Sequence, residues 1–330
     1  MAFPLWRCVL VLLPALVPCA AYFADAPYKY FLAGSAGDVQ KNTTPGFALV
    51  GGGKDQDSVM RWFLERSGGG DVVVLRASGA DGYNSYMKDL SAIDSVESLV
   101  VATPEAARDP FVAERIRKAE ALFIAGGDQW NYVRVWSHTP VAEAIQYLID
   151  KGVPVGGTSA GLAVLGEYLF TAEKDTVTTA QALANPFDEH VTVGSDFLRI
   201  PALKGVITDS HFHARDRMGR SLAFLARMLH EGKLNEARGI AIDERTAALT
   251  EAGGRIAVDG EGSVYFLRAR KPAEVCKAGT PLTFRGVEVY RAGKGGDFDL
   301  KTWSGHGGVA YTLDVVNGVV RSTQAGGGVY

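Results

Sequence analysis

One stretch restricts the fold of this chain more than any other: residues 153–165, where a short apolar run, a glycine-rich turn and a second apolar run follow one another. Residues 153–155 predict a buried strand, and residues 162–165 predict the start of a helix. Between them, residues 157–161 spell Gly-Thr-Ser-Ala-Gly, which fits the pattern G-x-S-x-G in the strand-turn-helix context that this motif requires. A sharp, strained turn of this kind would present the hydroxyl of Ser159 as a nucleophile.

The same turn has a second interpretation. A glycine-rich turn between a strand and a helix can also bind an anion or simply allow close packing. In the catalytic interpretation, the backbone N–H group of Ala160 points to the position where a tetrahedral oxyanion would form.

Apolar runs and helical patterns alternate over most of the chain. Strands are expected at residues 47–50, 72–75, 98–102, 121–125, 153–155, 205–208 and 240–242. Apolar residues at helical spacing occur over 141–149 and 222–229, and more briefly over 59–63. This alternation predicts an α/β fold with a mainly parallel sheet that is covered by helices on both faces. Ligands bind at the carboxyl ends of such strands, where we expect both Ser159 and the turn 126–129.

The pattern changes after about residue 247. Short alternating runs separated by turn residues predict strands at 255–258, 263–267, 287–290, 309–313 and 319–322. These strands either pack on the main sheet or form a small subdomain. We therefore divide the chain into an α/β catalytic domain, residues 22–250, and a β-rich C-terminal extension, residues 251–330.

The N-terminal residues have the features of a secretory signal peptide. Arg7 precedes an apolar run over 9–17, and Cys19-Ala20-Ala21 is a small-x-small cleavage site. The run is too short to span a bilayer, and a buried strand or helix is the alternative. We expect residues 1–21 to be removed and the mature protein to be secreted or periplasmic, without membrane association. Cys276 would then be the only remaining cysteine, so no internal disulfide could form.

The net charge of −3 gives no indication of a nucleic-acid partner.

A serine nucleophile needs a base within hydrogen-bond reach, and the base needs an acid to orient it. His211 and His213 follow the strand expected at 205–208, at the same sheet edge as Ser159. Because they alternate along an extended segment, only one of them can readily face the serine. The pair could also bind a metal or have no role. The other histidines are expected at a helix end or in loops: His138, His190, His230 and His306.

Candidates for the acid and for substrate binding occur in the same regions. Asp243 and Glu244 follow the strand at 240–242, where one could orient the histidine, although an Asp-Glu pair is more often a solvated turn or a helix cap. Three arginines follow the histidines, close to Asp209 in the sequence: Arg215, Arg217 and Arg220. They are either a solvated helix start or a clamp for a substrate carboxylate, for which the guanidinium group is suited. The nearby serine favours the clamp.

Four motifs follow one another along the chain. They are Gly126-Gly127-Asp128-Gln129, Gly156-Gly157-Thr158-Ser159-Ala160-Gly161, Asp209-Ser210-His211-Phe212 with the arginines behind it, and Ile242-Asp243-Glu244-Arg245-Thr246-Ala247. Together they resemble the cyanophycinase and dipeptidase E family of serine peptidases over roughly residues 45–250. The resemblance implies a three-layer α/β/α sandwich like that of class I glutamine amidotransferases, with serine in place of their cysteine.

By this resemblance, Ser159 matches the nucleophile, His211 the base and Glu244 the acid of the cyanophycinase branch. We expect the N–H groups of Gly127 and Ala160 to form the oxyanion hole. The residues expected to contact the substrate are Asp128, Gln129, Asp209, Arg215, Arg217 and Arg220, of which Gln129 and the arginines match the pocket of the family. Ser210 is a departure, because cyanophycinases usually carry glutamine there.

The resemblance implies a serine peptidase that hydrolyses aspartyl or β-aspartyl peptide bonds through an acyl-enzyme, without a metal or an organic cofactor. The signal peptide adds export, and both it and the β-rich extension depart from the intracellular, compact members of the family. The substrate would be a peptide or a cyanophycin-like polymer, which is polyaspartate with arginine on each β-carboxyl group. A homodimer is compatible with this interpretation. The alternatives are an α-aspartyl dipeptidase, an esterase of another G-x-S-x-G class that uses Asp243 and His306, and a non-catalytic peptide-binding member of the fold.

Overall fold

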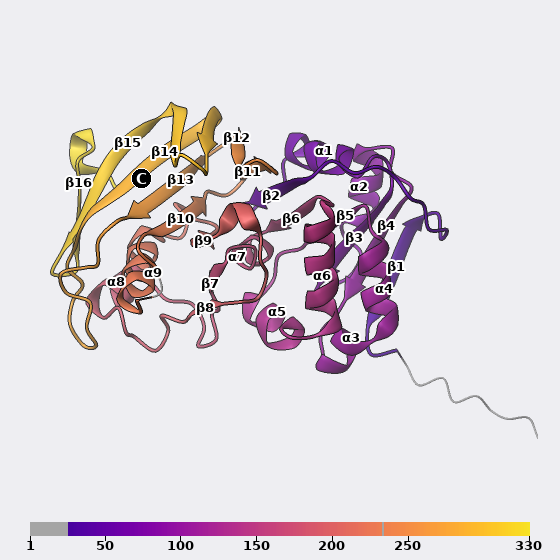
Figure 1. Cartoon of the computed structure of the whole chain (residues 1–330), viewed down its shortest axis with the longest axis horizontal. Helices are drawn as coiled ribbons and strands as arrows, with labels where there is room; N and C mark the ends of the chain where they lie inside the picture. The colour runs from indigo at the N-terminus through magenta and orange to yellow at the C-terminus, as the bar shows by residue number, and fades with distance from the viewer. Residues whose placement is uncertain (1–25, 233) are drawn as a thin grey trace, which may run out of the picture.

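The computed structural model describes residues 26–232 and 234–330, so the expected signal peptide 1–21 lies outside the described residues. The strands are β1 (Lys29–Gly34), β2 (Gly46–Val50), β3 (Asp71–Arg76), β4 (Ser95–Val100), β5 (Ala121–Ile124), β6 (Val155–Thr158), β7 (Tyr168–Phe170), β8 (Val193–Ser195), β9 (Val206–Asp209), β10 (Ala237–Ile242), β11 (Thr246–Glu251), β12 (Arg255–Gly260), β13 (Ser263–Ala269), β14 (Phe284–Asp299), β15 (Ser304–Val316) and β16 (Val319–Ser322). The α-helices are α1 (Asp57–Glu65), α2 (Asn84–Leu90), α3 (Pro104–Arg108), α4 (Pro110–Lys118), α5 (Gln129–Trp136), α6 (Pro140–Lys151), α7 (Ala160–Ala163), α8 (Thr179–Ala184) and α9 (Met218–His230). All described strands belong to one sheet (Figure 1).

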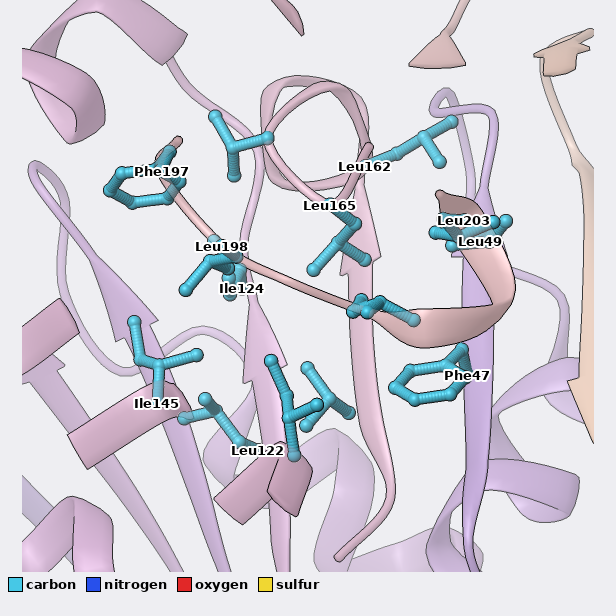
Figure 2. Close-up of a cluster of buried hydrophobic side chains, with 14 of the residues drawn as sticks. Phe47, Leu49, Leu122, Ile124, Ile145, Leu162, Leu165, Phe197, Leu198 and Leu203 are labelled. Carbon is cyan, nitrogen blue, oxygen red and sulfur yellow. The ribbon is translucent and has the colours of Figure 1, made fainter. Parts of the chain in front are cut away.

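The first half of the sheet is parallel and covered on both faces. Strands β4, β3, β5, β6 and β2 lie side by side in this order, and β1 adds an antiparallel edge. On β2, Phe47 and Leu49 pack with helices α3 to α6, while Ala48 and Val50 face helices α1 and α2. Figure 2 shows the first of these cores, where Ile145 of α6 packs over the sheet. The predicted three-layer α/β/α sandwich with a mainly parallel sheet is confirmed.

Two consecutive strands lie where the two halves of the sheet meet. β10 and β11 follow each other along the chain and are separated only by residues 243–245. β10 pairs in parallel with β9, whereas β11 pairs antiparallel with β2. The carboxyl ends of β9 and β2 therefore meet at the bend 243–245.

The residues after 250 extend the same sheet. β13 pairs with β10 and β12 with β11, both antiparallel, and β14 pairs with β12 and β13 through its two ends. β15 then adds to β14, and β16 to β15. Helix α9 covers these strands, with Leu222, Leu225 and Leu229 in a core that also holds Leu267 and Cys276. The extension therefore continues the main sheet by strand pairing instead of packing on its face.

Some element boundaries differ from those predicted. β6 begins at Val155 rather than Val153, because the N–H group of Val153 still bonds to Leu148 of helix α6 and Pro154 has no N–H group to donate. Helix α7 ends at Ala163, where the hydroxyl of Thr208 donates to the carbonyl oxygens of Leu162 and Ala163 at 3.0 and 3.3 Å. Strands β1, β7, β8 and β11 were not predicted.

Among the described helices, none combines the length and the apolar character needed to cross a bilayer.

Candidate active site

The turn between β6 and α7 holds Ser159 in a strained conformation. Its φ of 54° and ψ of −114° lie in a region that residues with a side chain rarely adopt, and such strain is common at functional sites. The N–H group of Ser159 donates to the carbonyl oxygen of Val50 on β2, at 3.0 Å. A Cβ atom on Gly161 would lie 2.0 Å from the carbonyl oxygen of Ile124, so this position of the motif accepts only glycine. The sharp turn expected from the sequence is present.

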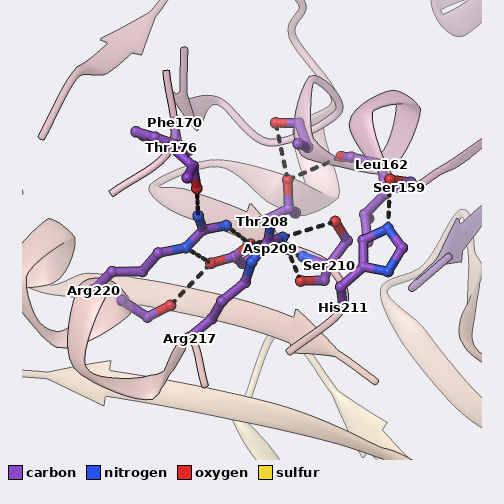
Figure 3. A network of polar contacts seen from close by, with 12 residues as sticks. Ser159, Leu162, Phe170, Thr176, Thr208, Asp209, Ser210, His211, Arg217 and Arg220 are labelled. Carbon is purple, nitrogen blue, oxygen red and sulfur yellow. Dashed lines mark hydrogen bonds and ion pairs between the residues drawn. The ribbon is translucent and has the colours of Figure 1, made fainter. Parts of the chain in front are cut away.

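His211 comes from the end of β9 and is fixed by the neighbouring strand ends. Its N–H group donates to Gly51 after β2, at 2.8 Å. The ring atom Nε2 lies 2.7 Å from Ser159 Oγ, and Nδ1 lies 2.7 Å from Glu244 Oε1 at the bend after β10. Figure 3 shows the ring of His211 beside Ser159. Three residues that are far apart in the sequence thus form one continuous row of hydrogen bonds.

The surroundings of this row suit proton transfer from the serine. Burial lowers the pKa of His211 below its usual value, the hydrogen bond to Glu244 offsets part of this effect, and the charges of Arg215 and Arg217 lower the pKa further. The imidazole is therefore neutral at neutral pH and can accept a proton at Nε2 when Nδ1–H donates to Glu244. The hydrogen bond from His211 lowers the pKa of Glu244, which keeps this carboxyl group ionised.

The other candidates for base and acid lie elsewhere. His213 is exposed, and its ring stacks on Tyr330 at 4.5 Å between centroids. Asp243 accepts a hydrogen bond from the N–H group of His213 at 2.9 Å, so it supports the backbone beside the site. His306, which the esterase alternative needs, is exposed on β15 and contacts Asp297.

The predicted oxyanion donors are next to the serine. Ala160 is the first residue of helix α7, where N–H groups have no partner within the helix. The turn after β5 reaches Ser159 from the other side, because a Cβ atom on Gly126 would lie 3.4 Å from the Cβ atom of Ser159. Gly127 follows and is exposed. This arrangement is consistent with the predicted oxyanion hole.

A cavity of about 410 Å³ extends from Gly127. It is lined by Gly127, Asp128, Gln129, Phe170, Arg215 and Arg217, together with residues from 172–178. Four of the predicted substrate residues are thus brought together. The carboxylate of Asp128 caps helix α5 by accepting from the N–H group of Trp130, and the amide of Gln129 donates to the carbonyl oxygen of Phe170 at 3.3 Å.

The prediction of substrate contacts is wrong for Asp209 and Arg220. Both are buried, with 6% and 2% exposure, and Arg220 binds Asp209 through Nε and Nη2 at 2.9 and 2.5 Å (Figure 3). Burial opposes the ionisation of Asp209, but Arg220 and Arg217 outweigh it and hold the pKa of Asp209 below its usual value. The two charges are already satisfied by each other inside the protein, so neither is available to a ligand.

The guanidinium groups of the other two arginines differ in how many partners they have within the protein. Arg217 donates through Nη1 to the carbonyl oxygen of Ser210 at 2.7 Å and to Asp209 at 3.3 Å, and burial lowers its pKa to about 10. Arg215 is exposed, and no acidic side chain of the described residues forms an ion pair with it. Of the three predicted arginines, Arg215 is the one available to bind a substrate anion.

Sequence reasoning missed the role of the glycines after β2. Gly52 has a φ of +93°, and a Cβ atom there would lie 2.5 Å from Cε1 and 2.6 Å from Nε2 of His211. Its carbonyl oxygen accepts a hydrogen bond from Arg245, next to Glu244, at 2.8 Å. The signal that could have indicated this role is the run Gly51-Gly52-Gly53 directly after the predicted strand at 47–50.

Replacing Gly52 with alanine should reduce kcat/KM by about 100-fold or more, because the added methyl group displaces the imidazole from Ser159 and ångström-scale misplacement has effects of this size. Gly205→Ala is the matched control, since Gly205 also has a positive φ of +71° but its nearest neighbouring atom lies 4.0 Å from the added Cβ. Steady-state kinetics on both variants, with circular dichroism to check folding, would test this. Equal losses in both variants would contradict it.

Comparison with known proteins finds relatives of one kind, the peptidases. Residues 76–188, which include the turn at Ser159, match the model of peptidase family S51. The chain is 27% identical to a cyanophycinase from Synechococcus elongatus over 77% of this chain and 78% of the relative. It is also 28% identical to a cyanophycinase from Geminocystis herdmanii, over 77% of this chain and 93% of the relative. The chain is thus similar to peptidases of family S51 and to cyanophycinases. These similarities support a hydrolase that cleaves peptide bonds.

A solved structure shows the same fold. The crystal structure of a peptidase from an acI-B1 Actinobacterium aligns with a TM-score of 0.52 and 18% identity. The alignment covers 98% of that chain but only 79% of this one, so this chain contains structure that the other chain lacks.

Proposed function

We propose that this protein is a peptidase of the S51 type that hydrolyses aspartyl or β-aspartyl peptide bonds, with Ser159 as nucleophile, His211 as base and Glu244 as the orienting acid. The observation that carries the proposal is the row of two 2.7 Å contacts that joins the three side chains. Relatives that are cyanophycinases by name support the substrate class.

The reaction would proceed through an acyl-enzyme. Nε2 of His211 takes the hydroxyl proton as Ser159 Oγ bonds to the substrate carbonyl carbon, and the N–H groups of Ala160 and Gly127 stabilise the oxyanion. His211 then gives the proton to the leaving amine, and the peptide C–N bond breaks. In the second half, His211 takes a proton from water, which attacks the ester and releases Ser159. Glu244 holds the ring and stabilises its charged form.

The aspartyl preference rests on the cavity. A substrate carboxylate there would meet the guanidinium group of Arg215, which can bind it with two parallel hydrogen bonds. Gln129 lines the same cavity and offers a polar side chain to the rest of the substrate.

Which aspartyl compound is used can be determined by supplying insoluble cyanophycin, α-aspartyl dipeptides and β-aspartyl dipeptides to the enzyme. Mass spectrometry would then distinguish β-aspartyl-arginine release from dipeptide cleavage, with Ser159→Ala as the blank.

We further propose, from the sequence of residues 1–21 alone, that the protein is exported. N-terminal sequencing of the protein recovered outside the cytoplasm would identify the cleavage site, and an N-terminus that retains Met1 would contradict the proposal.

Arg215→Ala should lower kcat/KM for aspartyl substrates by about 30-fold, because a charge-assisted pair lost from the pocket corresponds to roughly 2 kcal/mol. Arg215→Lys should restore little, since lysine provides the charge without the planar pair of donors. Hydrolysis of a neutral ester should change much less. If the alanine variant hydrolyses aspartyl peptides as well as the wild type, the aspartyl specificity has no support at this residue.

A further inference from the structure

The segment that carries Arg215 has few contacts of its own. Residues 213–216 are exposed, and Asp216 has a positive φ of 48°. Its internal hydrogen bonds are short-range turns, such as Arg215 N–H to His211 at 3.1 Å and Arg217 N–H to Phe212 at 3.0 Å. Two longer-range bonds hold its backbone on either side of Arg215: the N–H group of His213 donates to Asp243 at 2.9 Å, and the hydroxyl of Thr179 donates to the carbonyl oxygen of Asp216. Exposed segments with few buried apolar contacts open at low free-energy cost. Without further support, the guanidinium group of Arg215 would have no fixed position.

Tyr330 provides contacts at both ends of this segment. At one end its ring stacks on His213, with 4.5 Å between centroids and 19° between planes. At the other end its hydroxyl accepts a hydrogen bond from the N–H group of Met218 at 2.9 Å and donates one to Asp216 Oδ1 at 2.9 Å. Burial raises the pKa of Tyr330, so the hydroxyl keeps the proton that it donates.

The C-terminal strands hold Tyr330 in this position. The hydroxyl of Tyr311 on β15 donates to the carbonyl oxygen of Val329 at 2.9 Å, and the amide of Gln324 donates to the carbonyl oxygen of Tyr330 at 3.3 Å. The rings of Phe212 and Tyr265 contact the Tyr330 ring edge-on, at 5.7 and 6.0 Å. The C-terminal strands are thus linked through the side chain of Tyr330 to the segment that carries Arg215.

His211 does not depend on Tyr330 in the same way. Its backbone bonds to Gly51, the next residue Phe212 bonds to Ile242, and its ring is held by Glu244. Loss of Tyr330 should therefore loosen residues 213–217 and leave the contact between Ser159 and His211 intact.

We propose that Tyr330 is a positioning residue that fixes the segment 213–217 and so holds Arg215 in place for the substrate carboxylate. The proposal rests on the proposed function in one respect, the assignment of Arg215 to the substrate. It gives the β-rich extension a part in substrate selection.

The test compares Tyr330→Ala, Tyr330→Phe and Tyr147→Ala, the last being a half-exposed tyrosine on helix α6 that serves as the matched control. Three quantities are measured: kcat and KM for an aspartyl dipeptide, and the rate at which Ser159 reacts with a neutral fluorophosphonate. Tyr330→Ala should raise KM about tenfold and leave kcat and the labelling rate within about twofold. Tyr330→Phe should raise KM about threefold, because the ring contacts remain and the two hydrogen bonds are lost. Tyr147→Ala should change none of them.

Two further measurements separate this proposal from the proposed function. In an Arg215→Ala background, Tyr330→Ala should raise KM no further, because the residue that it positions is gone. Amide hydrogen exchange over 213–218 should be faster in Tyr330→Ala, whereas exchange at His211 should not change. If Tyr330→Ala does not fold, Tyr330→Phe carries the same comparison.

The outcomes are distinct. If Arg215→Ala raises KM but neither Tyr330 variant does, the positioning role is overturned and the proposed function stands. If Tyr330→Ala lowers kcat and labelling as much as it raises KM, Tyr330 supports the whole site and the proposal is also overturned. If Arg215→Ala has no effect, the proposed aspartyl contact fails, and unchanged exchange over 213–218 would overturn the remaining claim that Tyr330 fixes this segment.

Discussion

Ser159→Ala is expected to lower kcat by a factor of about 10⁴ or more, as for other serine nucleophiles that act with a base, while the fold remains intact. The hydroxyl oxygen is the atom that would form the acyl bond, and it lies 2.7 Å from the base. The measurement is hydrolysis of an aspartyl dipeptide by the purified variant, with circular dichroism and thermal unfolding to compare the folds.

Ser195→Ala is a suitable control, because Ser195 lies on β8 and its side chain contacts only the neighbouring Asp196 in the described structure. A fluorophosphonate should label the wild type and the control, but not Ser159→Ala. Activity of Ser159→Ala within tenfold of the wild type would exclude Ser159 as the nucleophile.

The second large effect is expected from a pair of histidines two residues apart. His211→Ala should lower kcat by a factor of about 10⁴, because no other group would take the proton from Ser159. His213→Ala should keep most of kcat, since this ring is exposed and stacks on Tyr330 rather than facing the serine. Loss of the stack should instead raise KM by a few-fold. Single-turnover kinetics on both variants would measure this contrast, and the reverse pattern would move the base to His213.

The sequence predicted which strand ends meet, because the alternation of strands and helices puts the carboxyl ends of parallel strands at one edge. Ser159, His211 and Glu244 each follow a strand that was predicted, so their approach could be inferred without coordinates. The local geometry of the turn was also predictable, because G-x-S-x-G in this context has few conformations.

Other features could not be predicted, because they depend on contacts between distant parts of the chain. Arginine and aspartate are usually exposed, so local sequence gave no sign that Arg220 and Asp209 bury each other. The fit of Gly52 against the imidazole depends on how β2 and β9 meet at residues 243–245, and that meeting point is set by strand pairing across the whole fold. Tyr330 lies far from Arg215 in the sequence, and no local pattern connects them.

The pairing of β11 with β2 also affects the stage of protein synthesis at which activity can arise. β2, near the beginning of the described chain, pairs with β11, which begins at Thr246, so this contact closes a very long loop. Pairings of this kind form late and slowly, because the entropy of closing the loop is lost before the contact stabilises anything. A growing chain can fold the first parallel strands and form the turn at Ser159 while the base and the acid are still absent. Such a chain would have no peptidase activity until Glu244 and β11 have been made and β11 has joined the sheet.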